Sequence, residues 1–155
     1  MADSTPVSTI MTTDVITMTS DLSVPEAADL LTEHRIGAAP VLDGEGRLVG
    51  LLRDEDLMVS EARLHAPSVI EFLGAELVWP PSLHRYEAEL RKFAASTVGE
   101  VMATKFAQVV PSDSIENAAT LMHDHAISHL PVVDNGRLVG ILARGDLIRF
   151  LAATT

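Results

Sequence analysis

The 155-residue chain contains no cysteine. The lack of thiols excludes a disulfide framework, a cysteine nucleophile and a cysteine-rich zinc site, although it does not fix the compartment. Positive charge is also scarce, because 11 Lys and Arg stand against 22 Asp and Glu, for a net charge of −11. Binding to a nucleic-acid backbone depends on Lys and Arg displacing counterions, so we expect no nucleic-acid partner. An anionic nucleotide needs only a local positive pocket.

Long apolar runs and targeting signals are missing as well. No run approaches the roughly 20 apolar residues of a membrane helix, and the start MADST has no basic flank or hydrophobic segment of a signal peptide. We therefore expect a soluble, cytoplasmic protein with no membrane contact. Hydrophobic residues make up 47% of the chain and charged residues 21%, which is typical of a folded globular protein.

The sequence contains an internal repeat. Three blocks recur in the same order, 90 or 91 residues further along the chain: Val7 with Met11 as Val98 with Met102, 36–43 (IGAAPVLD) as 127–134 (ISHLPVVD), and 46–52 (GRLVGLL) as 136–142 (GRLVGIL). We place the first repeat at 1–58 and the second at 97–155, joined by a segment without a counterpart at 59–96.

Both repeats predict the same order of elements. A β-prone run at 15–18 or 108–110 precedes a helix with apolar residues at helical spacing, and Ser23 and Ser114 are placed to N-cap the two helices. Two short strands around a glycine-bearing hairpin turn follow, and then a final helix.

The predicted fold class is α/β, with the order β-α-β-β-α present twice. Both helices of a repeat would cover one face of its small sheet and leave the other, apolar face for the second repeat. We therefore expect the two repeats to pack sheet to sheet around a pseudo-twofold axis, with two symmetry-related clefts between them and a partly helical connection.

A strand proline, a hairpin, a glycine and a following Asp recur in order over about 7–58 and 98–151. In these features the sequence resembles the CBS (cystathionine-β-synthase) domain family. The resemblance implies a regulatory tandem pair without catalytic chemistry, which requires no cofactor and binds an adenosyl small molecule. It implies AMP, ADP, ATP, NAD or S-adenosylmethionine as the ligand, and a homodimer as the assembly.

In that family the last helix follows a Gly-aliphatic-aliphatic-Ser/Thr-x-x-Asp pattern, and the Asp accepts hydrogen bonds from the ribose hydroxyls. The resemblance gives this role to Asp56 and Asp146, although an Asp in a first helical turn can also simply complement the helix dipole. The Ser/Thr is absent from both repeats, being Arg53 and Ala143. Arg53 and Arg144 could supply the anion contact instead, or lie solvated at the surface.

The two clefts are predicted to differ. Residues 54–56 (DED) concentrate negative charge, which would repel a polyphosphate, whereas the surroundings of Asp146 are milder. His129 matches a family position that often faces the phosphates, and its counterpart Ala38 is small. We expect the Asp146 cleft to be occupied if only one is.

The resemblance places the base beside residues 12–15 and 104–106. Apolar side chains near these segments would form the walls that a flat base requires, unless they are ordinary core. The candidate residues from these segments and from the starts of the paired strands are Thr12, Val15, Ile36, Lys105, Phe106 and Ile127.

Metal binding and catalysis are both disfavoured by the sequence. His123 and His125 point apart on a helix, and His129 lies past the helix end, so one ion would not gather all three. Ser128 and His129 are neighbours in sequence only and lack a strand-turn-helix elbow. We predict no metal site and no enzymatic activity.

The leading functional hypothesis is a stand-alone energy sensor that signals nucleotide occupancy through a change in module or dimer geometry to a regulated protein partner. The alternative is an assembly module whose nucleotide sites are degenerate, and a metabolic enzyme is the third possibility. The helix predicted in 59–96 either packs on its own module or belongs to a partner surface containing Phe72 and Trp79.

Overall fold

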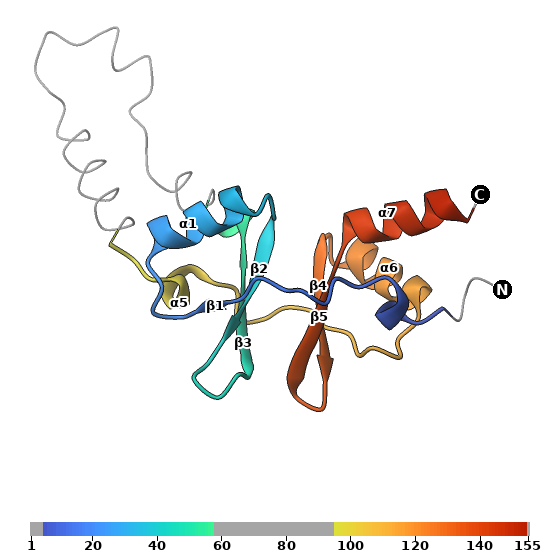
Figure 1. Ribbon diagram of the computed structural model, residues 1–155, viewed down its shortest axis with the longest axis horizontal. Coiled ribbons are helices and arrows are strands. Elements are labelled where there is room, and N and C mark those ends of the chain that lie inside the picture. The colour runs from blue at the N-terminus through green and yellow to red at the C-terminus, as the bar shows by residue number, and fades with distance from the viewer. Residues whose placement is uncertain (1–4, 58–94, 155) are drawn as a thin grey trace, which may run out of the picture.

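The computed structural model describes residues 5–57 and 95–154 (Figure 1). The helix and the partner surface predicted within 59–96 lie outside the described residues. In chain order the elements are η2 (Val7–Thr9), β1 (Met18–Thr19), α1 (Val24–Glu33), β2 (Ala38–Leu42), β3 (Leu48–Arg53), α5 (Val98–Val101), α6 (Ile115–Asp124), β4 (His129–Asp134), β5 (Arg137–Ala143) and α7 (Arg144–Ala153).

The two long internal helices begin where the sequence predicts. The Ser23 hydroxyl accepts the backbone N–H of Glu26 at 3.3 Å, and the Ser114 hydroxyl accepts that of Asn117 at 3.0 Å. Each bond satisfies one of the N–H groups that a helix start leaves without a partner. The buried face of these helices consists of Val24, Ala27 and Leu31 in α1 and Ile115, Ala118 and Met122 in α6.

The two sheets are related but not identical. In the first, β1 runs parallel to β2, and β2 pairs with β3 in antiparallel register. In the second, β4 and β5 form the antiparallel pair, and Val109 makes a single parallel bridge to Val132 in place of a third strand. The second hairpin turns through Asn135 and Gly136, both with positive φ (52° and 80°), as a two-residue type I′ turn requires.

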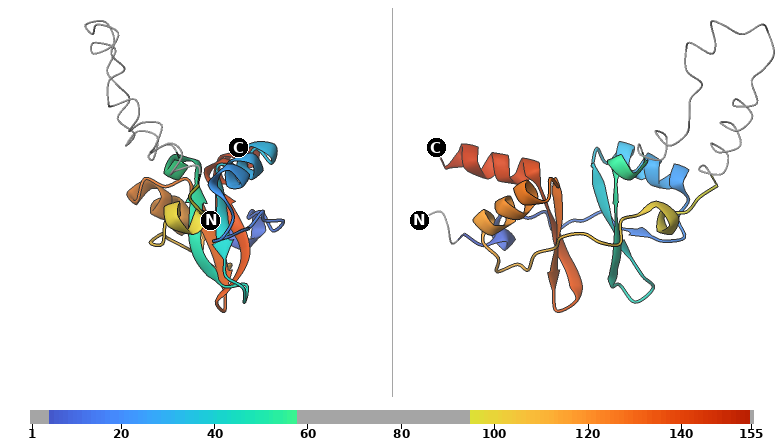
Figure 2. Two further views of the ribbon diagram at one scale, coloured as in Figure 1. Left: turned by 90° about the vertical axis from the view of Figure 1, so that its left-hand side faces the viewer. Right: turned by 180° about the vertical axis from the view of Figure 1, so that it is seen from behind.

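The repeats pack sheet to sheet, and the predicted fold class is confirmed. Figures 1 and 2 show the two sheets side by side at the centre, with α1 and α5 on one flank and α6 and α7 on the other. At the hairpin ends the strands of the two repeats meet, because Arg47 and Arg137 form an antiparallel bridge.

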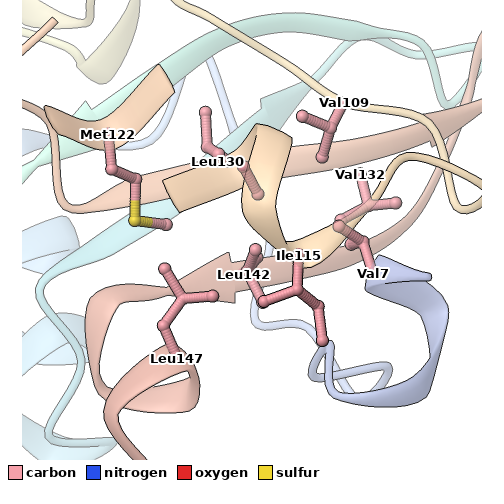
Figure 3. Close-up of a cluster of buried hydrophobic side chains, with 9 residues drawn as sticks. Val7, Val109, Ile115, Met122, Leu130, Val132, Leu142 and Leu147 are labelled. Carbon is pink, nitrogen blue, oxygen red and sulfur yellow. The ribbon is translucent and has the colours of Figure 1, made fainter. Parts of the chain in front are cut away.

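The N-terminal segments of the two repeats are exchanged. Val7 is fully buried in the core of the second repeat, among side chains such as Leu130 and Leu142 (Figure 3), whereas Val98 is fully buried in the core of the first. Each repeat therefore completes its core with a segment that the sequence assigns to the other.

Backbone pairing follows the same exchange. Thr12 and Ile141 of β5 exchange two hydrogen bonds of 2.9 Å, and Ala103 and Leu51 of β3 do the same. Each of these two bridges joins the N-terminal segment of one repeat to a strand of the other repeat.

Glycine makes this close approach possible. A Cβ atom added to Gly140 would lie 2.6 Å from Met11 Sδ and 2.9 Å from Thr12 O, and one added to Gly50 would overlap the Met102 side chain. A glycine inside a strand often marks a site where another chain segment approaches closely. The recurring Met and Gly of the sequence repeat are therefore contact partners across the exchange.

Candidate functional site

The two predicted ribose-binding carboxylates lie at the ends of β3 and β5, where the chain turns into a helix. The Asp56 carboxylate accepts the Arg53 backbone N–H at 2.9 Å, and the Asp146 carboxylate accepts that of Ala143 at 2.8 Å. Neither Arg53 nor Ala143 has a side-chain oxygen that could cap the helix. The carboxylate three residues later therefore takes a backbone N–H at the helix start, as in one half of a capping box.

The two carboxylates differ in how firmly an arginine holds them. Arg53 donates to Asp56 from Nε at 3.1 Å and from Nη2 at 2.8 Å, and its side chain is only 29% exposed. Asp146 is 7% exposed and is paired with Arg149, whose side chain is 73% exposed. Displacing a solvated arginine from a carboxylate costs little free energy, whereas displacing a half-buried arginine that donates two hydrogen bonds costs more.

Arg53 therefore lies on its own helix start and does not extend into the cleft. Its guanidinium also reaches Glu55 at 3.2 Å, and the hydrogen bond to Asp56 raises the pKa of Arg53 above its usual value. Its predicted role as an anion contact requires it to leave these partners. Arg144 is exposed at the start of α7 and has no side-chain hydrogen bond or ion pair to the part of the chain that the structure describes.

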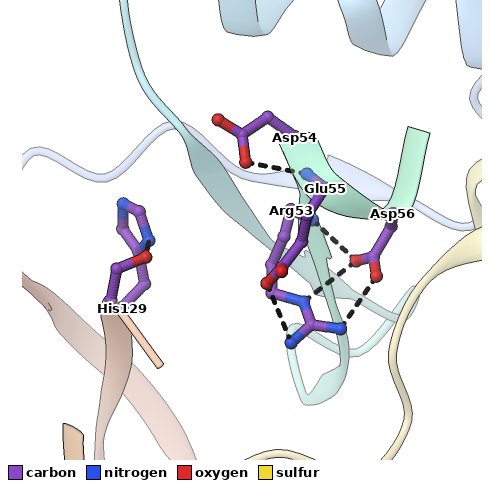
Figure 4. Close-up of polar contacts among 6 residues, drawn as sticks. Arg53, Asp54, Glu55, Asp56 and His129 are labelled. Carbon is purple, nitrogen blue, oxygen red and sulfur yellow. Dashed lines mark hydrogen bonds and ion pairs between the residues drawn. The ribbon is translucent and has the colours of Figure 1, made fainter. Parts of the chain in front are cut away.

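The His129 side chain reaches from the second repeat to the first. A Cβ atom added to Gly37 would lie 3.2 Å from His129 Cε1 and 3.3 Å from Asp54 Oδ2, so the imidazole and the carboxylate both lie close to this glycine. Figure 4 shows His129 facing the helix start that carries Asp54 and Asp56. The Ser128 hydroxyl lies 3.0 Å from His129 Nδ1.

The electrostatic environment of His129 includes both helix starts. Burial lowers the pKa of the His129 imidazole, and the Arg144 guanidinium acts in the same direction. Three carboxylates oppose this shift, in the order Asp54, Asp146 and Glu55. His129 therefore lies between the acidic groups of the two predicted clefts.

The exchange of N-terminal segments decides which base segment joins which carboxylate. Thr12 pairs with β5, the strand that leads to Asp146, and Ala103 pairs with β3, the strand that leads to Asp56. The predicted base segments 12–15 and 104–106 therefore each begin beside the strand of the opposite repeat. Both segments were predicted from the sequence, but the strand that each one pairs with was not.

The other predicted site residues have different surroundings. Ile36 and Ile127 pack against the two hydrophobic cores, the role weighed for them as an alternative. Ala38 is buried in β2 at 4% exposure. Thr12 and Lys105 are exposed, and Phe106 is partly buried.

Val15 lines a cavity of about 250 Å³ at the hairpin ends of the strands, which we call the hairpin cavity. Neither Asp56 nor Asp146 lines it, because both lie at the opposite ends of β3 and β5. Its lining consists of Thr13, Val15, Thr17, Leu42, Gly46, Arg137, Leu138 and Val139.

Two features of residues 5–57 and 95–154 bear on other functions. None of its helices has the length and apolar character needed to cross a bilayer. No three His, Asp or Glu side chains within residues 5–57 and 95–154 converge on a common point where a metal ion could bind.

Comparison with known proteins finds the same repeat. The family model for the CBS domain matches twice, over residues 7–62 and 98–153. The chain belongs to the CBS-domain family. The CBS domain-containing protein YhcV of Bacillus subtilis is 35% identical over 137 residues, which cover 88% of this chain and 79% of YhcV.

Solved CBS-domain pairs share the fold. The crystal structure of CBSX2 in complex with AMP is 28% identical, with a TM-score of 0.73, and the match covers 96% of this chain and 97% of CBSX2. The CBS domain pair of MJ0100, in complex with 5′-methylthioadenosine and S-adenosyl-L-methionine, is 25% identical with a TM-score of 0.71 and coverage of 97% and 98%. The tandem CBS pair predicted from the sequence is thereby confirmed.

Proposed function

We propose that this CBS pair is a regulatory module that binds an adenosine-containing nucleotide between its repeats, with the Asp146 carboxylate accepting hydrogen bonds from the ribose hydroxyls. The observation that carries the proposal is the Thr12–Ile141 ladder, because it sets the base segment of one repeat beside the strand that ends at the ribose carboxylate of the other. The AMP complex of CBSX2 and the adenosyl complex of MJ0100 support this ligand class.

The Asp146 cleft is the preferred one. A ribose that binds Asp146 displaces the exposed Arg149 side chain and leaves the bond to the Ala143 N–H in place. A ribose that binds Asp56 competes with two guanidinium hydrogen bonds from a half-buried Arg53. Because the solvated Arg149 makes a weaker pair than a half-buried arginine that donates two hydrogen bonds, the ribose displaces Arg149 more easily than Arg53, and the Asp56 cleft binds more weakly.

The phosphate groups would face His129 and Arg144. Arg144 is exposed at the first turn of α7, where backbone N–H groups also favour anions. Partial burial lowers the pKa of His129, so the imidazole is neutral at physiological pH and can donate one hydrogen bond. A ligand held by groups from both repeats would favour one arrangement of the repeats, which is the requirement for a signal.

An assembly module is the second candidate. Ile148 and Leu151 are 59% and 61% exposed and lie three residues apart, on one face of α7. An exposed apolar face on a helix suits a contact with another protein or a second copy. The homodimer, the regulated partner, the energy-sensing role and the cytoplasmic location remain predictions.

The decisive experiment is a calorimetric and thermal-shift titration with AMP, ADP, ATP, NAD and S-adenosylmethionine. A ligand at about 100 times its dissociation constant adds about 2.7 kcal/mol of stability. Asp146→Asn keeps an oxygen for the Ala143 N–H but removes the charge, and Asp56→Asn is the matched control. We expect Asp146→Asn to weaken binding at least tenfold and Asp56→Asn to weaken it much less. No shift with any nucleotide at millimolar concentration would leave the assembly module as the function.

A further inference from the structure

The hairpin cavity lies away from the two ribose carboxylates, although Thr13 and Val15 in its lining also belong to the predicted base segment 12–15. Its walls combine apolar side chains, such as Val15 and Leu138, with two hydroxyl groups, from Thr13 and Thr17, and one cation, Arg137. None of the described residues that line it carries a carboxylate. The chain carries a net charge of −11, whereas the charged side chain among the described lining residues is an arginine.

The Arg137 guanidinium has no hydrogen bond or ion pair within residues 5–57 and 95–154. Its backbone is nevertheless held on two sides, by Asp134 in the register of the second hairpin and by the bridge to Arg47 of the first. The base of the side chain is therefore fixed while its charged end remains available.

At the corresponding position of the first repeat, an ion pair neutralises the arginine. Arg47, the counterpart of Arg137 in the repeat, is paired with Glu45 at 2.5 Å. Glu45 has no counterpart in the second repeat, because the Asn135–Gly136 turn is one residue shorter than the turn of the first hairpin. The shorter turn thus removes the acid that would compete for Arg137.

We propose that the hairpin cavity binds a small organic carboxylate, with the carboxylate group on Arg137 and its apolar body against Val15 and Leu138. A guanidinium matches a carboxylate in a bidentate manner, and the Thr13 and Thr17 hydroxyls can donate to the same oxygens. The volume of about 250 Å³ lies just below the range of drug-sized pockets, which limits the ligand to a small molecule. Because both hairpins line the cavity, the ligand would contact both repeats.

The test uses two-dimensional amide NMR of the full chain with three probes. Benzoate has both the carboxylate and a flat apolar body, benzamide has the body without the charge, and acetate has the charge without the body. We expect benzoate to shift the amide signals of Thr13, Thr17 and Val139 in a saturable way. Benzamide and acetate should each bind at least tenfold more weakly.

Two variants test whether Arg137 provides the positive charge that binds the carboxylate. Arg137→Met keeps the length of the side chain without its charge and should weaken benzoate binding at least tenfold, whereas Arg47→Met should leave it within twofold. An unchanged amide spectrum outside the hairpins shows that both variants are folded. Benzoate shifts that do not saturate, equal binding of benzamide, or equal loss in both arginine variants would overturn the proposal. Titration of Arg137→Met with the five nucleotides separates the two proposals, because the Asp146 cleft should be unaffected.

Discussion

Replacement of Gly140 by Ala tests the exchanged packing directly. The new methyl group would lie 2.6 Å from Met11 Sδ and 2.9 Å from the carbonyl oxygen of Thr12. The sulfur belongs to a flexible side chain, but the carbonyl accepts the Ile141 N–H in the ladder and cannot retreat without breaking that pair. Overpacking of this kind costs about 1 to 3 kcal/mol, so we expect a loss of about 2 kcal/mol.

Gly50→Ala is the matched control, because the three atoms nearest to its methyl group all belong to the Met102 side chain. An unbranched methionine can adopt another rotamer, so this variant should lose less than about 1 kcal/mol. For a chain of this size a loss of 2 kcal/mol lowers Tm by about 4 to 8 °C. Urea unfolding monitored by circular dichroism gives the free energies themselves.

A double-mutant cycle separates the two contacts of Gly140. In the Met102→Ala background the cost of Gly50→Ala should nearly vanish, whereas Met11→Ala should recover only part of the cost of Gly140→Ala, because the Thr12 carbonyl remains. Equal stabilities of Gly140→Ala and Gly50→Ala, or a Gly140→Ala variant more stable than the wild type, would show that the strands do not approach as described.

Three further predictions concern pH, capping and the exchange. Burial lowers the pKa of His129, so the unfolded chain binds its proton at a higher pH than the folded one, and stability falls as the pH drops below about 6.5. Urea unfolding at about pH 7.5 and about pH 5 should show a smaller acid loss for His129→Gln than for the wild type, and an equal loss would contradict this cause. Ser114→Ala should cost about 1 kcal/mol and Ser114→Gly only a few tenths, and equal costs would argue against the side-chain cap. Val7→Ala should speed amide hydrogen exchange in α6, β4 and β5, and Val98→Ala should speed it in α1, β2 and β3, whereas the reverse assignment would refute the exchange.

Local structure was predictable because its determinants are local. The caps at Ser23 and Ser114, the hairpin glycines and the helical spacing of apolar residues each act within a few residues. The repeat then supplied the partner for each apolar face, which yields the fold class. These steps need no knowledge of distant contacts.

The composite clefts were not predictable in the same way, because they depend on contacts between residues 52 and 129 positions apart in the chain. Thr12 pairs with Ile141, and Leu51 pairs with Ala103, yet no local pattern states which repeat an N-terminal segment joins. Gly50 and Gly140 carried the signal, since a repeated glycine inside a strand indicates a close approach. The Arg53–Asp56 contact was missed for another reason. An arginine or an aspartate at a helix start can bind a ligand or a neighbouring side chain, and the sequence does not distinguish the two.

The crossed N-terminal segments also bear on how such a pair arose. A single repeat cannot complete its own core, since the segment that fills it comes from the other repeat. A one-repeat ancestor would therefore have been a twofold dimer in which two chains traded their first residues, as in domain swapping. Gene duplication and fusion would then have turned an intermolecular exchange of segments into an intramolecular one, after which each repeat could change its sequence independently. The shortened second hairpin, and His129 with Ala38 as its counterpart, are differences that a symmetric dimer could not have had.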